Sequence, residues 1–315
     1  MLARTQLRTY RFLCRCYSTG RPFKQVRSQS SGDLKVEQFR AEYFLPGRPV
    51  LLRNHSQSIP AISKWFLPIP SNGNGISEGS KQLNIPYLEQ YGFVPVPLEL
   101  TRSIGGDGTA FTKTTSFDRF EAPLSLFLSF TSELAPEDPS ARLYLAQCSI
   151  DDLPAPLRAD LPMPDIVRTA GKGDIYASSI WLGRPPTRTP MHRDPNPNLF
   201  IQLAGRKVVR LVEPEEGRAL YERVRVGEGH ANLRGEEMMV GGERERIEEA
   251  VWGDGGGEED HIQYDCGWEA RLESGDALFI PLGWWHSVRG IGEGVTGSVS
   301  NFSGRLMRGY IYIYC

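Results

Sequence analysis

The chain has no long hydrophobic run and few cysteines. No apolar stretch approaches the roughly 20 residues that a membrane helix needs, so we expect no membrane span. Two of the five cysteines, Cys14 and Cys16, lie near the N-terminus, and Cys148, Cys266 and Cys315 are far apart. These positions match neither a zinc spacing nor a disulfide framework. They are typical of a reduced, intracellular protein.

Acidic residues are absent before Asp33. Arginines recur there every three or four residues, at positions 4, 8, 11 and 15, with apolar residues between them. Such a basic amphipathic segment is typical of a mitochondrial presequence, and Arg15-Cys16-Tyr17-Ser18 resembles a matrix-peptidase site. A disordered basic tail is the alternative. We therefore interpret residues 1–32 as a leader and predict a location in the mitochondrial matrix.

The charge of the remaining chain is negative. Cleavage after Tyr17 would remove four arginines and change the formal charge from −2 to −6, which makes nucleic acid an unfavourable partner. Residues 213–260 hold 15 acidic residues against 6 arginines. This composition predicts a solvated, partly disordered insertion between strands, to which we assign no chemistry.

Glycine (33) and proline (23) are plentiful, which favours many short elements joined by turns. The sequence predicts short strands at 175–183, 198–205, 206–214, 277–283, 285–290 and 296–303. Their spacing is typical of an antiparallel β-sandwich or barrel. Upstream, it predicts a helix at 34–45, a buried strand within 46–54, a polar loop at 71–80, a helix within 117–130 and a strand at 141–150.

His192 and Asp194 stand two residues apart in TPMHRDPNPNLF. Residues i and i+2 of a strand point to the same face, so an imidazole and a carboxylate would project together here. This pair suits Fe(II), Mn(II) or Zn(II), and no other histidine of the chain has an acid at i+2. A hydrogen-bonded surface pair is the more common explanation of an isolated His-x-Asp.

A third ligand must come from elsewhere, and His286 is the best candidate. It follows an apolar strand and Trp284-Trp285, whereas the other histidines lie in polar, loop-like contexts. A core histidine bonded to a carbonyl is the alternative. Two histidines and a carboxylate form the facial triad of non-haem Fe(II) oxygenases.

Lys207 in RKVVRL shares strand parity with Val209 and Leu211, which places it on the apolar, inward face. A buried ammonium is costly without an anionic partner. A bound dicarboxylate would supply that partner, and a lysine that snorkels to the rim is the alternative.

Taken together, GDIYASSIWLG, TPMHRDPNPNLFIQLAGRKVVRLVEP, GDALFIPLGWWHSV and VSNF resemble the JmjC domain in its cupin-like branch, and FRAEYFLPGRPVLLRN resembles the segment that precedes that barrel. The resemblance covers most of residues 34–303. It implies a mainly β protein, a double-stranded β-helix (jelly-roll or cupin) with flanking N-terminal helices. We expect an α/β lead-in at 33–143, the barrel at 144–303 and a short tail at 304–315. The dimerising helices that end many such hydroxylases are not expected.

The resemblance also implies roles for individual residues. His192, Asp194 and His286 would bind iron, and Lys207 would bind the far carboxylate of 2-oxoglutarate. In the asparaginyl-hydroxylase-like members, the positions of Thr189 and Tyr144 bond the same carboxylate, and those of Asn198 and Asn301 line the cosubstrate and metal region. Tyr144 as a packed strand residue and Asn301 as a strand-end residue are the alternatives. Trp181, Trp284 and Trp285 would help to build the walls, although core packing is the favoured explanation for at least two of them.

The implied activity is that of an Fe(II)-, 2-oxoglutarate- and O2-dependent dioxygenase, which yields succinate and CO2 and hydroxylates a side chain of a protein substrate. A methyl-lysine demethylase is the first alternative, although no reader domain or histone-tethering segment is evident in the sequence. A non-catalytic cupin that binds a ligand or partner is the second. Hydroxylation of a modified tRNA base is disfavoured by the acidic charge.

Overall fold

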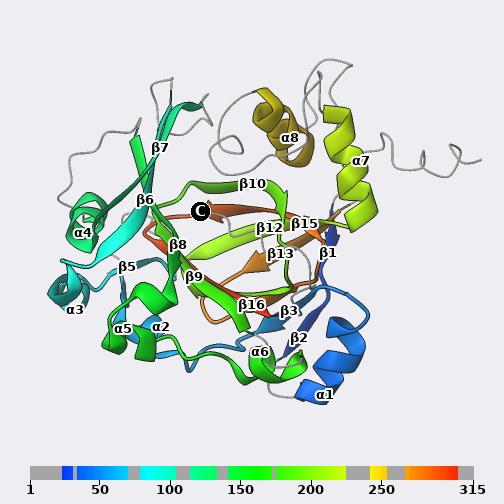
Figure 1. The fold of residues 1–315 in the computed structure, drawn as a ribbon, viewed down its shortest axis with the longest axis horizontal. Helices are drawn as coiled ribbons and strands as arrows, with labels where there is room; N and C mark the ends of the chain where they lie inside the picture. The colour runs from blue at the N-terminus through cyan, green and yellow to red at the C-terminus, as the bar shows by residue number, and fades with distance from the viewer. Residues whose placement is uncertain are drawn as a thin grey trace, which may run out of the picture.

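The computed structural model describes residues 23–30, 34–69, 79–103, 114–132, 141–171, 175–224, 242–253 and 267–303. Two packed sheets dominate these residues (Figure 1). The smaller sheet has the order β1 (Lys24–Gln25), β13 (Trp268–Leu272), β12 (Arg206–Val212), β15 (Trp285–Ile291), β10 (Thr187–Arg193). The larger has the order β2 (Ser28–Ser30), β3 (Val50–Arg53), β14 (Ala277–Ile280), β11 (Asn198–Ala204), β16 (Thr296–Ser303), β9 (Ile175–Gly183), β8 (Ala141–Ser149), β6 (Pro95–Ser103), β7 (Thr114–Pro123).

Strands β9 to β16 form the barrel, and consecutive strands lie in opposite sheets except β12 and β13, which are neighbours in the small sheet. The order β13-β12-β15-β10 faces the order β14-β11-β16-β9, with antiparallel pairing throughout. A double-stranded β-helix has this arrangement of two packed jelly-roll sheets. The predicted fold is therefore confirmed, and most of the strands expected between residues 141 and 303 are present within a few residues of their predicted bounds.

Short helices cover the outer face of the large sheet (Figure 1). They are α1 (Val36–Phe39) with the π-helix η2 (Arg40–Phe44), α2 (Pro60–Lys64), α3 (Ile85–Leu88) with the 3-10 helix η3 (Glu89–Tyr91), α4 (Leu124–Thr131), the 3-10 helix η4 (Ile150–Asp152), α5 (Ala155–Ala159) and α6 (Asp165–Ala170). A small ribbon, β4 (Phe66–Pro68) and β5 (Lys81–Leu83), lies beside them. Among the described residues, no helix has the length and apolarity that crossing a bilayer requires.

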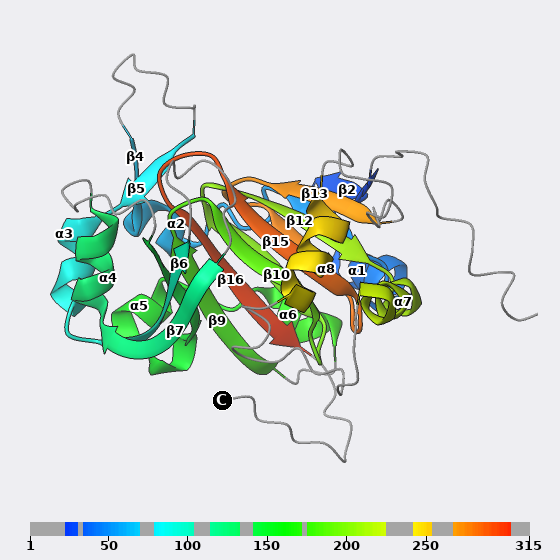
Figure 2. The same cartoon turned by 90° about the horizontal axis from the view of Figure 1, so that it is seen from above.

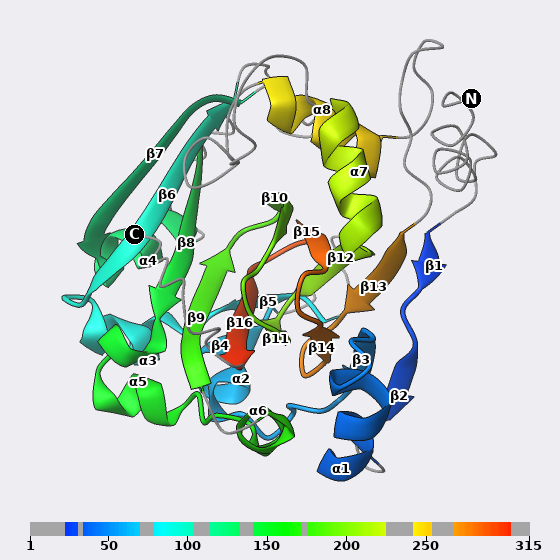
Figure 3. The ribbon, with the colours of Figure 1, turned by 45° about the vertical axis from the view of Figure 1, so that its right-hand side comes forward.

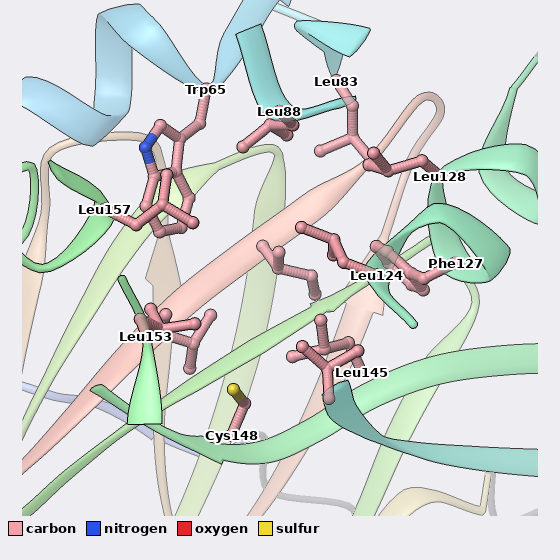
Figure 4. A pocket seen from close by; sticks show the side chains of 13 residues that line it. Trp65, Leu83, Leu88, Leu124, Phe127, Leu128, Leu145, Cys148, Leu153 and Leu157 are labelled. Carbon is pink, nitrogen blue, oxygen red and sulfur yellow. The ribbon is translucent and has the colours of Figure 1, made fainter. Parts of the chain in front are cut away.

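The largest apolar core lies between these helices and the large sheet, because both bury their apolar faces there. A small apolar cavity remains within it, lined by 13 side chains that include Trp65, Phe127 and Cys148 (Figure 4). Cys148 is a free, buried thiol. A second core fills the barrel between the sheets and includes Val209 and Leu211. The cavity belongs to the outer core and not to the barrel interior.

The sequence assigned residues 23–30 to the leader, and for these residues that assignment is wrong. There, β1 pairs in parallel with β13 and β2 with β3, so the segment adds an edge strand to each sheet. Val26, between the two strands, is buried in the barrel core. Residues 1–22 and 31–32 of the predicted leader, residues 71–78 of the predicted polar loop at 71–80, and the tail at 304–315 lie outside the described residues.

The helix expected within 117–130 is correct only in its second half. Residues up to Pro123 form β7, which pairs with β6, and α4 begins at Leu124. Proline disfavours helical geometry at the residue before it, and its fixed φ suits a helix start. The apolar pattern of this segment is compatible with a helix or a strand, and pairing with β6 selects the strand up to Pro123.

The acid-rich segment also differs from the expectation. It contains two helices, α7 (Pro214–Val224) and α8 (Gly242–Trp252). They lie over the small sheet in Figure 2 and Figure 3. Their apolar residues form a third core with two residues of the barrel: Met191, Val212, Leu220, Tyr221, Val224, Ile247, Ala250 and Val251. The prediction of a solvated segment is wrong for these two helices.

Candidate metal and cosubstrate site

The two histidines lie side by side on adjacent strands of the small sheet. His192 on β10 is the antiparallel partner of His286 on β15, and a shift in register separates Thr189 from His192. Asp194 follows directly after β10. Cross-strand partners point to the same face, so the register places both imidazoles beside the carboxylate.

Short distances join the three side chains. His192 Nε2 lies 3.7 Å from Asp194 Oδ1, and His286 Nε2 lies 3.5 Å from Asp194 Oδ2. The ring centroids are 4.2 Å apart, and one donor atom from each residue lies within 4.8 Å of the others. The structure thus brings together the three residues that the sequence indicated. Two imidazole nitrogens and a carboxylate oxygen fit a divalent transition metal such as Fe(II).

Backbone carbonyls orient both imidazoles. His192 Nδ1 lies 2.8 Å from the Pro190 carbonyl oxygen, and His286 Nδ1 lies 3.4 Å from that of Trp284. A proton on each Nδ1 leaves the Nε2 lone pair directed at Asp194. Burial, with a smaller contribution from His192, lowers the pKa of His286 to about 4. Its imidazole is therefore neutral at physiological pH, which is the form that binds a metal.

Lys207 lies in the barrel interior, as its strand parity predicted. Its side chain is 2% exposed, and Nζ donates hydrogen bonds to Ser298 Oγ (2.7 Å) and Tyr144 Oη (3.2 Å). The Phe200 ring centroid is 5.3 Å away. Burial lowers the pKa of Lys207 to about 7, and no carboxylate of the described residues forms an ion pair with it. A bound dicarboxylate would supply the missing counter-charge.

Tyr144 reaches Lys207 from the large sheet. Burial raises the pKa of its phenol, and its side chain is hydrogen-bonded to Thr187 of β10. Gly183 makes room for the ring, because a Cβ there would lie 2.4 Å from it. The Trp181 ring lies 6.1 Å from the Tyr144 ring, centroid to centroid. Tyr144 and Trp181 therefore both belong to the wall around Lys207.

The other predicted cosubstrate residues have partners within the sheets. Thr189 lies on β10, and its carbonyl accepts a 2.9 Å bond from Ser287 Oγ. Asn198 and Asn301 are each 2% exposed, and the backbone N–H of Asn301 donates to Asn198 Oδ1 at 3.1 Å. The Asn301 side chain bonds Ser178 and the Leu199 carbonyl. These contacts tie β11 to β16 and β9, and the cosubstrate roles of the three residues stay predictions.

Trp284 and Trp285 differ from Trp181. Trp284 is 8% exposed within the barrel core, and its Nε1 donates to the Gly47 carbonyl at 3.1 Å. Trp285 stacks on Tyr221 of α7, with ring centroids 5.7 Å apart. Both contacts are packing contacts, which agrees with the alternative explanation for two of the three tryptophans.

Sequence reasoning missed Ser298, Thr187 and Phe200. Ser298 and Phe200 approach Lys207 from the opposite sheet, and Thr187 approaches Tyr144 from β10. The only signal in the sequence was the run of small polar residues in TGSVSNFS, which is unusual for a strand that is buried on both faces. Which of these residues face the lysine depends on the pairing between strands.

Known proteins match over most of the chain. The family model described as "Cupin-like domain" matches residues 36–302. Lysine-specific demethylase JMJ30 of Arabidopsis thaliana is 26% identical over 299 residues, which cover 92% of this chain and 57% of that protein. Jumonji C domain-containing protein 5 of Drosophila melanogaster is 29% identical over 270 residues, which cover 81% and 54%. The human bifunctional peptidase and (3S)-lysyl hydroxylase JMJD7 is 27% identical over 179 residues, which cover 54% and 48%. The chain spans about half the length of these curated relatives.

Proposed function

We propose that this chain, which belongs to the cupin-like JmjC domain family, is an Fe(II)- and 2-oxoglutarate-dependent dioxygenase that hydroxylates a side chain of a protein substrate. The observation that carries the proposal is the His192, Asp194 and His286 cluster, with the buried Lys207 ammonium in the same barrel. A binding scaffold without catalysis has no need of all four residues in this arrangement.

The family depends on Fe(II), 2-oxoglutarate and O2, which together supply oxidising power: the oxo acid becomes succinate and CO2, and a C–H bond of the substrate is hydroxylated. In this chain, the two Nε2 atoms and the Asp194 carboxylate would hold the metal. Lys207 would bind the far carboxylate of the cosubstrate, with the Tyr144 hydroxyl beside it. Thr189, Asn198 and Asn301 would complete the surroundings of the cosubstrate.

The barrel also accounts for positioning of the substrate. A C–H bond must be held close to the metal for hydroxylation, and much of the rate gain from such an enzyme comes from orientation. The triad residues are partly or fully buried: the side chains of His192 and Asp194 are 23% and 19% exposed, and that of His286 is 4% exposed. The substrate would therefore approach from the side of His192 and Asp194, the two more exposed ligands.

Demethylation of methyl-lysine is the second candidate, because two of the relatives above carry a lysine-directed activity in their names and one of these is a demethylase. The two reactions share a first step, in which a C–H bond is hydroxylated. When that bond belongs to an N-methyl group, the product breaks down to formaldehyde and the amine. A stable gain of one oxygen by a protein or peptide, without formaldehyde, supports the hydroxylase. Formaldehyde release from a methylated peptide supports the demethylase.

The first experiment needs no substrate. Fe(II) and 2-oxoglutarate are added to purified protein without oxygen, and the visible spectrum is recorded. We expect a weak charge-transfer band that requires both additions, is lost in His192→Ala and is weakened in Lys207→Ala. The absence of a band from well-folded wild-type protein would contradict the proposed activity, and a binding scaffold would then become the leading function.

The mitochondrial location is a separate proposal, which rests on the arginine pattern of residues 4–15. Import of the full chain into isolated mitochondria, with loss of an N-terminal peptide, is the expected result. Replacement of the four arginines at 4, 8, 11 and 15 with glutamine should abolish import. Accumulation of the unaltered chain in nuclei would instead favour the demethylase.

A further inference from the structure

The residues next to the two histidines in sequence all lie on the opposite face of the small sheet, the face that α7 and α8 cover. Successive side chains of a strand point to opposite faces. His192 is flanked by Met191 and Arg193, and His286 by Trp285 and Ser287. Met191 is 2% exposed within the third core, together with apolar residues of α7 and α8. The helices of the acid-rich segment therefore lie directly behind the triad.

Helix α7 contacts this surface through Trp285. Its Tyr221 stacks on the Trp285 ring at an interplanar angle of 25°. Gly217 allows the close approach, because a Cβ at that position would lie 2.1 Å from the indole. On the same tryptophan, the Arg193 guanidinium lies 5.7 Å from the ring centroid. Trp285, the residue before His286, thus contacts both Arg193, the residue after His192, and helix α7.

Helix α8 contacts the same strands through Trp252. Its Nε1 donates a 2.8 Å hydrogen bond to Ser287 Oγ, which in turn donates a 2.9 Å bond to the Thr189 carbonyl. Two guanidinium groups contact the Trp252 ring system, with Arg289 at 4.2 Å and Arg210 at 4.4 Å from ring centroids. This chain of contacts runs from α8 through β15 to β10, and so links the strands that carry the two histidines.

Ion pairs add to the contact of α8 with the sheet. Glu248 Oε1 accepts hydrogen bonds from Arg289 at 2.6 Å and 3.2 Å, and Arg188 Nη1 lies 3.7 Å from the same oxygen. Arg289 and Arg188 are cross-strand partners on β15 and β10. Their side chains are less than one-fifth exposed, so solvent screens these pairs less than it screens surface pairs.

We infer that α7 and α8 are positioning elements of the metal site, with Trp252 and Ser287 as the positioning residues. The inference rests on the proposed function, since it assigns a role towards a metal bound by the triad. Groups that fix the orientation of metal ligands raise the affinity of the site, because less conformational freedom is lost on binding. Here the support comes from behind the sheet, through the residues that alternate with the ligands.

The test compares two variants that each lose one indole hydrogen bond. Trp252→Phe keeps an aromatic ring beside the two arginines but cannot donate to Ser287. Trp65→Phe is the matched control, since Trp65 Nε1 donates a 2.9 Å bond to Asp160 in the outer core, away from the triad. Mn(II) affinity is measured by calorimetry on full-length, folded protein, without substrate or turnover, and the Co(II) absorption spectrum reports ligand geometry.

We expect Trp252→Phe to weaken Mn(II) binding about tenfold and to alter the Co(II) spectrum. Trp65→Phe should lower thermal stability and leave both metal readouts unchanged. Ser287→Ala should match Trp252→Phe, and the double variant should bind as weakly as either single variant. Because Ser287→Ala leaves α8 intact, it serves as the test if Trp252→Phe does not fold.

Three other results are informative. Wild-type Mn(II) affinity in both Trp252→Phe and Ser287→Ala would overturn the positioning role and leave the proposed function standing. Equal weakening in Trp65→Phe would overturn it as well, because the effect would then be general loosening of the fold. Failure of wild-type protein to bind Mn(II), Co(II) or Fe(II) would overturn the proposed function itself.

Discussion

The two faces of the large sheet are covered by regions of different chemical character. The outer face, under the short helices, buries an apolar cluster that extends from Phe39 to Val299. The inner face closes the barrel, where the apolar cluster is smaller and polar groups such as Lys207, Ser298 and Asn198 are buried among it. The same strands thus support an apolar core on one side and a barrel interior with buried polar side chains on the other.

One face of the sheet therefore contributes mainly to stability, and the other mainly to the proposed function. Burial of apolar area stabilises a fold, and the outer core provides most of it. Burial of an ammonium such as that of Lys207 destabilises the fold unless a partner is present. The barrel interior therefore gives up stability where a ligand is expected, and the outer core offsets that loss.

Phe127 and Phe200 compare the two faces most directly. Phe127 is 0% exposed in the outer core, and Phe200 is 5% exposed beside Lys207. Each substitution by alanine should lower the free energy of unfolding by about 4 kcal/mol, measured by denaturant titration. Only Phe200→Ala should also weaken 2-oxoglutarate binding to the folded protein. Equal weakening of 2-oxoglutarate binding in Phe127→Ala would contradict the different roles of the two faces.

The N-terminal strands define where the barrel begins. Removal of residues 1–30 takes away β1, β2 and the buried Val26, and should lower the free energy of unfolding by about 3 kcal/mol. Removal of residues 1–22 keeps every contact of the described residues and is the matched control. Thermal melts of the two truncated proteins check the prediction, and equal melting temperatures would place the start of the domain after residue 30.

Lys207→Met should stabilise the protein while it abolishes cosubstrate binding. Burial lowers the pKa of Lys207 from 10.5 to about 7, so between these values the unfolded state binds more protons, and wild-type stability rises with pH. The variant lacks this dependence. Its advantage, about 5 kcal/mol for a pKa shift of this size, should be full below pH 7 and shrink as the pH rises towards 10.5. Unfolding at several pH values measures it, and a constant difference would contradict the lowered pKa.

The sequence predicted those parts of the site that depend on position along one strand. His192 and Asp194 follow from the period of two, and the same parity places Lys207 inside. His286 needed its aromatic context and the family resemblance. Ser298 and Thr187 could not be found, because their contacts depend on register between strands far apart in sequence. Pairing of β7 with β6 was hidden for the same reason.

Helices α7 and α8 were missed because composition was given more weight than periodicity. Leu220, Tyr221 and Val224 lie on one face of α7, and Ile247, Ala250 and Val251 on one face of α8. This helical spacing was present in the sequence, but the many acidic residues favoured a solvated segment. Net charge describes the exposed face of such a helix and leaves its buried face undetermined.

The smallest expected effect is the loss of one hydrogen bond to the charged Lys207, compared with the loss of another buried hydroxyl on the same strand. Ser298→Ala removes the 2.7 Å hydrogen bond to Lys207 Nζ, and Ser300→Ala changes a buried serine on the same face of β16. Loss of one bond to a charged group costs about 1.5 kcal/mol. Ser298→Ala should therefore weaken 2-oxoglutarate binding about tenfold, whereas Ser300→Ala should bind nearly as wild type. Calorimetric titration with 2-oxoglutarate in the presence of Mn(II) measures both. If Ser298→Ala binds as tightly as wild type, Tyr144 and the cosubstrate alone satisfy the ammonium, and the large sheet contributes less to the site than its contacts indicate.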